Sequence, residues 1–203
     1  QGFRALGALG AGPICRPMDR GHDGFLYGEA CAALVVTRPE LAGGTIYGRV
    51  LGAGFCADGS RGPEPNSDGQ VRAAQDALAA AGLAAADIDY VNGHATGTPS
   101  GDDAELETLR RLGLAHARVN ATKSIIGHGL SAAGAIEAAA VLIQMREGWL
   151  HPVLHLETPL DEGFGWVRGA AQEHRIRHAL KLSFGFGGVD TALVVQASGE
   201  GQA

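Results

Sequence analysis

The sequence is poor in the features that would point to a disulfide scaffold, a nucleic-acid partner or a membrane span. Its 203 residues include three cysteines, none of them in a CxxC pair, which excludes a disulfide framework and favours free thiols in the cytoplasm. Sixteen basic side chains against 22 acidic ones give a net charge of −6, which argues against nucleic acid as a partner. No run approaches the ~18 apolar residues of a membrane span, so we expect no membrane segment.

Lysine is also scarce, whereas glycine is in excess. Only Lys123 and Lys181 occur, so the role of each lysine is considered individually. Glycine supplies 32 residues without a collagen-like period, which predicts tight turns and close backbone approaches in a globular protein. The length suits one large domain or half of a duplicated one. The start at Gln1, with neither an initiator Met nor a signal peptide, favours a fragment, a processed product or part of a split protein.

Strand and helix signals alternate along the chain in the order of an α/β layered protein. The expected strands lie at 24–36, which reads as buried, and at 46–55, 87–92, 119–122, 179–183 and 191–196. The expected helices lie at 71–81, with Gly82 as the C-cap, at 101–112 and at 130–145. A further strand pair follows Gly148, and a glycine-rich turn at 184–188 closes the last two strands into a hairpin.

Two of the eight histidines stand in unusual settings. His94 follows a predicted strand and is surrounded by small residues, and His128 lies between a predicted strand and the helix 130–145. Loops at the carboxyl ends of strands are where open α/β sheets bind ligands. The alternative is that each is a hydrogen-bonded structural histidine. Neither has a Cys or His neighbour at metal-ligand spacing, so we expect no metal site.

Glu137 is a lone carboxylate inside a helix that is apolar nearly all round, and we therefore expect that helix to be buried. Such a group is costly to bury unless it is paired, and the available cation is Lys123 on the preceding predicted strand. This pair is either a structural ion pair or one that orders a site beside His128.

The turn at 184–188, with the sequence FGFGG, lacks the Lys-Ser/Thr of a P-loop and the GxGxxG opening of a dinucleotide fold. Between two strands, such a run more plausibly turns backbone N–H groups toward a ligand, as an oxyanion donor would.

Taken in order, these segments resemble the C-terminal part of a β-ketoacyl-acyl carrier protein synthase, or ketosynthase. The motifs that carry the resemblance are RPMD…DGF…GE at 16–29, NGHATGTPSGD at 92–102, KSIIGH at 123–128, AAGAIE at 132–137 and FGFGG at 184–188. Five ordered motifs spread over nearly the whole chain make the match highly specific.

The resemblance implies a thiolase-like layered α-β-α fold, of which this chain is the C-terminal half of the duplicated domain. Residues 1–42 would end the N-terminal half, and residues 43–203 would form the C-terminal half. The nucleophilic cysteine of the family lies upstream, and none of Cys15, Cys31 and Cys56 sits in its motif. We therefore expect another polypeptide or segment to complete the domain, and two complete units to form a dimer.

The resemblance also implies roles for individual side chains. His94 and His128 would be the two histidines of a Cys-His-His site, and Lys123 and Glu137 would order the second histidine. Phe186 would be the gating aromatic residue whose backbone N–H joins the oxyanion hole.

Substrates of the family arrive on the phosphopantetheine arm of acyl carrier protein, which Thr96 and Thr98 would line; no other cofactor is implied.

Three activities remain open at this stage. The first is decarboxylative Claisen condensation with malonyl-acyl carrier protein in polyketide or fatty-acid biosynthesis. Ala95 and Gly97 depart from the family pattern, as do Leu182, Val189 and Asp190 around the closing turn. Such divergence is compatible with a second activity, decarboxylation of malonyl-carrier protein without condensation. The third is a non-catalytic partner subunit similar to a chain-length factor, against which the retention of both histidines argues.

Overall fold

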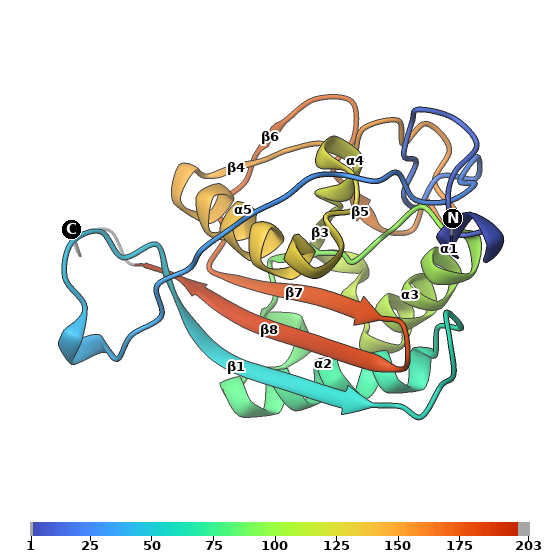
Figure 1. Ribbon diagram of the computed structural model, residues 1–203. Helices are drawn as coiled ribbons and strands as arrows, with labels where there is room; N and C mark the ends of the chain where they lie inside the picture. The colour runs from blue at the N-terminus through green and yellow to red at the C-terminus, as the bar shows by residue number, and fades with distance from the viewer. Residues whose placement is uncertain (1, 199–203) are drawn as a thin grey trace.

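The computed structural model describes residues 2–198, and its centre is a six-stranded mixed sheet (Figure 1). The strands, in spatial order, are β1 (Gly48–Ala57), β8 (Val189–Ala197), β7 (His178–Gly185), β2 (Tyr90–Asn92), β3 (Arg118–Asn120) and β5 (Gly165–Trp166). The first three run antiparallel, and β7, β2, β3 and β5 run parallel. The strand pair expected after Gly148 is β4 (Trp149–Leu150) with β6 (Gln172–Glu173).

Helices lie on both faces of this sheet (Figure 1). On one face are α2 (Ser67–Ala81) and α3 (Pro99–Leu112), and on the other is α5 (Ala133–Glu147). Two short helices, α1 (Gly2–Ala5) and α4 (Lys123–Ile126), lie outside these layers, and short 3-10 turns occur at Pro39–Leu41, Ala85–Asp87, Leu114–His116 and Leu130–Ala132. The sheet and its helices confirm the α/β layered prediction.

Alternate residues of the central strands pack into two separate cores. On β7, Leu180 and Leu182 join the core under α2 and α3, whereas Ala179 joins Val141 and Met145 of α5. This alternation is the period of two that a strand imposes on its side chains. It places the next residues on the α5 side of β7, Lys181 and Ser183, beneath the start of that helix.

Glycines in β1 let α2 lie directly against the sheet. A Cβ added to Gly54 would lie 1.9 Å from the carbonyl oxygen of Ala73, and one added to Gly52 would lie 2.2 Å from that of Ala77. No real Cβ atom approaches a backbone oxygen so closely, so only glycine fits at these positions. The high glycine content therefore serves close packing here, as the composition predicts.

The helix ends follow from local capping. Gly82 is in the left-handed conformation, with φ of 67°, and caps α2 as predicted. The helix begins at Ser67, earlier than the predicted residue 71, because the side chain of Asn66 accepts a hydrogen bond from the N–H of Asp68.

The prediction of a buried strand at 24–36 is wrong. Only isolated bridges occur there, at Phe25 and Tyr27, and beyond them the segment crosses in front of α5 without pairing (Figure 1). Val35 is 96% exposed. The residues have strand-like composition, but a strand also needs a neighbour with free backbone groups, and beyond Gly28 the segment pairs with no strand among residues 2–198.

Two further predictions need correction. Lys123 starts α4 rather than lying on a strand, because β3 ends at Asn120. The helix at 130–145 starts as a 3-10 turn and buries only one side, since Ile143 on its outer side is 53% exposed. Over residues 2–198, no helix has the length and apolar character needed to cross a membrane.

Candidate active site

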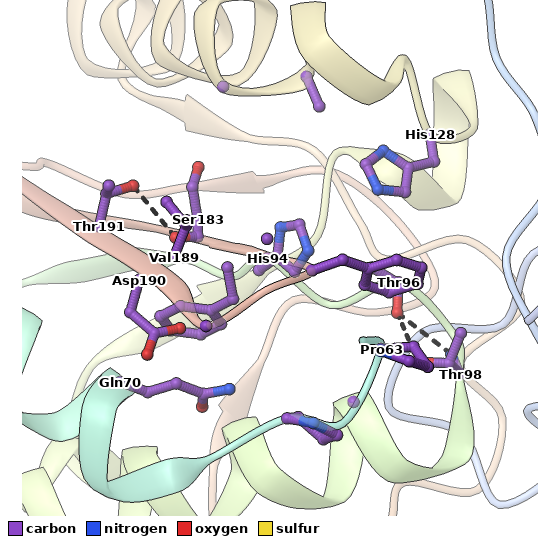
Figure 2. Close-up of a pocket in the computed structure, with 18 of the residues that line it drawn as sticks. Pro63, Gln70, His94, Thr96, Thr98, His128, Ser183, Val189, Asp190 and Thr191 are labelled. Carbon is purple, nitrogen blue, oxygen red and sulfur yellow. Dashed lines mark hydrogen bonds between the residues drawn. The ribbon is translucent and has the colours of Figure 1, made fainter. Parts of the chain in front are cut away.

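Segments that follow β2 and β3 bring the two histidines together at one end of the sheet. His94 lies two residues after β2, and His128 lies just after α4, which follows β3. Their ring centroids are 5.6 Å apart with the rings nearly perpendicular at 83°. Both line a cavity of about 540 Å³, together with Thr96, Thr98 and Phe186 (Figure 2). The five cavity-lining residues named from the sequence therefore meet in one place.

Two buried carboxylates of α3 hold the loop that carries His94. Glu105 accepts hydrogen bonds from the backbone N–H of His94 at 2.7 Å and of Ala95 at 2.6 Å. These bonds fix Ala95 at a positive φ of 31°, which a non-glycine residue rarely adopts. Burial raises the pKa of Glu105 to about 7. Nothing in the sequence singled out Glu105, because acids at the start of that helix are also explained by its dipole.

Asp102 ties the same loop to the N-terminal segment. Its carboxylate accepts from the N–H of Gly97 at 3.0 Å and from the N–H of Met18 at 2.7 Å. His22 also contacts it at 3.1 Å, and this hydrogen bond raises the pKa of His22. The motif at 16–29 thus supports the loop of His94, although no strand of that region joins the sheet.

The hydrogen bonds of Lys123 reach His94, whereas the resemblance implied that Lys123 orders His128. Its ammonium donates to the carbonyl oxygen of His94 at 2.5 Å and lies 3.1 Å from Nδ1 of the same ring. It also donates to Oε1 of Glu137, so the predicted buried pair exists. The expectation for His128 came from the family resemblance. In the fold, α4 turns the side chain of Lys123 back toward the loop after β2.

His128 is held by different contacts. Its ring Nδ1 accepts a hydrogen bond from the N–H of Leu130 at 3.2 Å, and its backbone N–H donates to the carbonyl of Leu26 at 2.7 Å. The ring packs edge-on against Phe25, with centroids 5.1 Å apart. The segment before residue 30 therefore supports both histidines.

These contacts assign the ring protons of both histidines. The Nδ1 atom of His94 faces an ammonium group and that of His128 faces a backbone N–H, so each Nδ1 accepts and each neutral ring carries its proton on Nε2. Desolvation by burial, followed by the charge of Lys123, holds the pKa of His94 well below its usual value. The same causes lower the pKa of His128 to about 4. Near neutral pH, the cavity presents two uncharged Nε2–H donors.

Lys181, like Glu105, is a buried residue near the site that the sequence analysis did not assign to it. Its Nζ lies 2.8 Å from Oε2 of Glu137, and it also donates to the hydroxyl of Ser183, which lines the cavity. Glu137 thus lies between two ammonium groups, one on each oxygen.

Phe186 stands at the rim of the cavity in the turn between β7 and β8. Its side chain is 49% exposed and packs near Phe3, with ring centroids 5.8 Å apart. The turn is fastened to the loop after β1, because Asp58 N–H donates to the carbonyl of Gly188 and Gly187 N–H donates to that of Gly62, both at 2.9 Å. Below it, the hydroxyls of Thr96 and Thr98 are 2.8 Å apart (Figure 2).

None of the three cysteines, all of which lie within the described residues, lines this cavity. Cys15 is buried, and its burial raises its pKa to about 11, so the thiol stays protonated. Within residues 2–198 no group of three or more His, Cys, Asp or Glu side chains is arranged to hold a metal ion.

Comparison with known proteins gives the family of the chain. Residues 47–157 match the family described as Beta-ketoacyl synthase, C-terminal domain. The chain belongs to the β-ketoacyl synthase family. It is 46% identical over 206 residues to the polyketide biosynthesis malonyl-ACP decarboxylase PksF of Bacillus subtilis, covering 97% of this chain and 50% of that protein. It is 40% identical over 194 residues to the chloroplastic 3-oxoacyl-acyl-carrier-protein synthase II of Arabidopsis thaliana, covering 88% of this chain and 35% of that protein.

The fold of this β-ketoacyl synthase chain is similar to that in a solved complex of a type II polyketide synthase acyl-carrier protein with its ketosynthase. The TM-score is 0.91 at 28% identity, and the match covers 98% of this chain and 52% of the other. The thiolase-like fold expected from the motifs is confirmed. The chain spans about half, or less, of the length of these relatives.

Proposed function

We propose that this chain forms the C-terminal half of a β-ketoacyl-acyl carrier protein synthase that performs decarboxylative Claisen condensation. The observation that carries the proposal is the pair of neutral imidazoles, His94 and His128, whose Nε2–H donors share one cavity. Two donors that meet in a partly buried site suit a carbonyl oxygen on which negative charge develops.

In the proposed reaction, malonyl thioester loses its carboxylate as carbon dioxide, and the electron pair of the broken C–C bond moves into an enolate. The enolate oxygen accepts hydrogen bonds from Nε2–H of His94 and of His128. Because both rings are uncharged, they stabilise the oxyanion and are poor donors of a whole proton to it. The enolate carbon then attacks an acyl thioester on a cysteine of the missing half. The new C–C bond forms as the cysteine thiolate leaves, which yields a β-ketoacyl thioester on the carrier.

We assign the remaining predicted residues by their places around the cavity. The hydroxyls of Thr96 and Thr98 line the path of the phosphopantetheine arm, which carries the substrate, so the reaction needs no further cofactor. Phe186 gates that path from the rim, and its backbone N–H contributes to the hole for the acyl oxygen.

The proposed partners follow from the relatives, since the chain spans about half, or less, of their length. The nucleophile is supplied by an N-terminal ketosynthase half, and acyl carrier protein delivers the substrates, as it binds its ketosynthase in the solved complex. We propose that two complete units pair as a dimer. The three free cysteines support a reducing compartment, and we place the protein in the cytoplasm.

A second function is decarboxylation of malonyl-carrier protein without condensation. It is favoured by the 46% identity to a malonyl-ACP decarboxylase and by Asp190, which departs from the family pattern at the closing turn. Both functions use the same two imidazoles for the first step and differ in whether an acyl nucleophile site is present. A non-catalytic partner subunit is the least supported, because both histidines are retained and neutral.

The test is product analysis with the complete protein, in which this chain is joined to or bound by its N-terminal half. Malonyl-carrier protein is added with and without an acyl-carrier protein, and carbon dioxide and carrier-bound products are measured by mass spectrometry. We expect carbon dioxide together with β-ketoacyl-carrier protein. Carbon dioxide with acetyl-carrier protein alone would replace condensation by the second function, and no carbon dioxide at all would overturn both.

A further inference from the structure

Lys181 is buried beside the proposed site, yet the proposed reaction gives it no role. It is 3% exposed, and its two contacts are Oε2 of Glu137 and the hydroxyl of Ser183. Its neighbours on the same face of β7 are Ala179 and Ser183, and neither carries a charge that could pair with the lysine. A buried ammonium needs a charged partner, which here is the carboxylate that also holds Lys123.

These groups form one connected chain across four segments. Lys181 on β7 contacts Glu137 on α5, Glu137 contacts Lys123 on α4, and Lys123 contacts Nδ1 and the carbonyl of His94 after β2. Glu137 is 1% exposed and Lys123 is fully buried, so water does not screen these contacts. Each carboxylate oxygen has its own cation, which fixes the carboxylate plane. Without Lys181, Oε2 would lose the cation that faces it, and the carboxylate would be free to turn.

The charges of this cluster also act on the imidazoles. Two ammonium groups, Lys123 and Lys181, face the one carboxylate of Glu137 next to His94, while the nearby Glu105 accepts from the backbone N–H of His94. Lys123 and Lys181 both lower the pKa of each histidine, whereas Glu137 raises that of His128. Protonation of either imidazole, which would add a positive charge beside these ammonium groups, is therefore disfavoured.

We propose that Lys181 is a positioning residue for the proposed reaction: by holding Glu137, it places the Lys123 ammonium against Nδ1 of His94 and so keeps the ring proton on Nε2. The inference rests on the function proposed above and adds a residue to it. Lys181 touches neither substrate nor reacting atoms and acts through Glu137 and Lys123.

The test compares Lys181→Met with Leu182→Ala in the complete protein. Methionine keeps the length of the side chain and removes its charge. Leu182 is the next residue of β7, fully buried on the opposite face, and its truncation destabilises the same strand without touching the charge cluster. Carbon dioxide release from malonyl-carrier protein is measured against pH, and side-chain nitrogens of histidine are followed by ¹⁵N NMR.

We expect Lys181→Met to lower kcat with KM unchanged and to move the acid limb of the profile upward by about one pH unit, because a nearby positive charge has been removed. The NMR titration of His94 moves in the same direction. Leu182→Ala lowers Tm and leaves both the acid limb and the titration where they are. A Lys181→Met protein with wild-type pH profile and wild-type histidine titration would overturn the inference.

The two proposals fail separately. If the wild-type protein releases no carbon dioxide, the proposed function is wrong, whereas the NMR titration still decides whether Lys181 controls the proton of His94. If the wild type is active and the two variants behave alike, Lys181 has only a structural role.

Discussion

At the scale of single residues, the short-range part of the site was predictable and the long-range part was not. His94, Thr96, Thr98, His128 and Phe186 stand in local motifs, and the fold brings them to one cavity. The pairing of Lys123 with Glu137 followed from the scarcity of partners for a buried carboxylate. Three contacts could not be predicted, because they depend on which distant segments come together in the fold. Lys123 contacts His94, Glu105 binds the loop of His94, and Lys181 contacts Glu137.

Replacement of His94 tests the imidazole pair directly. We expect His94→Ala in the complete protein to lower the rate of malonyl decarboxylation by about 10²–10³-fold, because one of two donors to the enolate oxygen is lost. The fold is retained, since Glu105 contacts the backbone of residue 94 rather than its ring. His116→Ala is the matched control, because that histidine is exposed and lies outside the cavity. Unchanged carbon dioxide release by His94→Ala would defeat the assignment.

Replacement of Glu137 tests the buried pair. Glu137→Leu leaves Lys123 and Lys181 as buried ammonium groups without a carboxylate, and we expect a loss of about 3–5 kcal/mol of unfolding free energy. Denaturant unfolding of the complete protein measures this loss of unfolding free energy. Activity falls as well, because Lys123 loses the group that positions it. A variant as stable and as active as the wild type would mean that the pair does not hold the site.

At the scale of elements, most helices and strands were predicted because their signals are local. The C-cap at Gly82 and the hairpin of β7 and β8 are set by neighbouring residues. The prediction of a strand at 24–36 was wrong because amino-acid composition indicates strand propensity and does not show whether a partner strand is present. Apolar residues of that segment lie exposed instead, as Val35 illustrates.

Asp190, the second residue of β8, makes the stability of the fold depend on pH. Burial, followed by the charge of Asp58, raises the pKa of Asp190 to about 7. The folded state therefore keeps a proton that the unfolded state loses near pH 4, so stability falls as pH rises from about 4 to about 7. We expect Asp190→Asn to raise Tm at pH 8 and to change it little at pH 4. Thermal melts of the complete protein at both pH values measure this; an equal Tm difference at both would contradict it.

At the scale of the whole molecule, helices cover both faces of the sheet, and part of the outer side of α5 is exposed. Exposed apolar side chains occur on α5 at Ile143, on β1 at Val50 and Phe55, and on the unpaired segment at Val35 and Val36. Where exposed apolar side chains adjoin one another, they mark an interface. Such an interface fits the proposal that a second ketosynthase half packs here, since the chain spans about half of its relatives.

Isolated preparation of the chain tests that proposal. We expect residues 1–203 alone to aggregate or to bind a hydrophobic dye, and the N-terminal half to suppress both when it is co-expressed. Light scattering and dye fluorescence report the two effects. A sharp monomer peak with cooperative melting and no dye binding would show that the exposed face needs no cover.

The central claim is that His94 and His128 act on one substrate oxygen. The most direct measurement is a crystal structure of the complete protein with a non-hydrolysable malonyl thioester analogue on a pantetheine arm. We expect the thioester oxygen to lie within hydrogen-bond distance, about 2.7–3.2 Å, of Nε2 of both histidines. An analogue bound in the cavity with that oxygen in contact with neither imidazole would contradict the account.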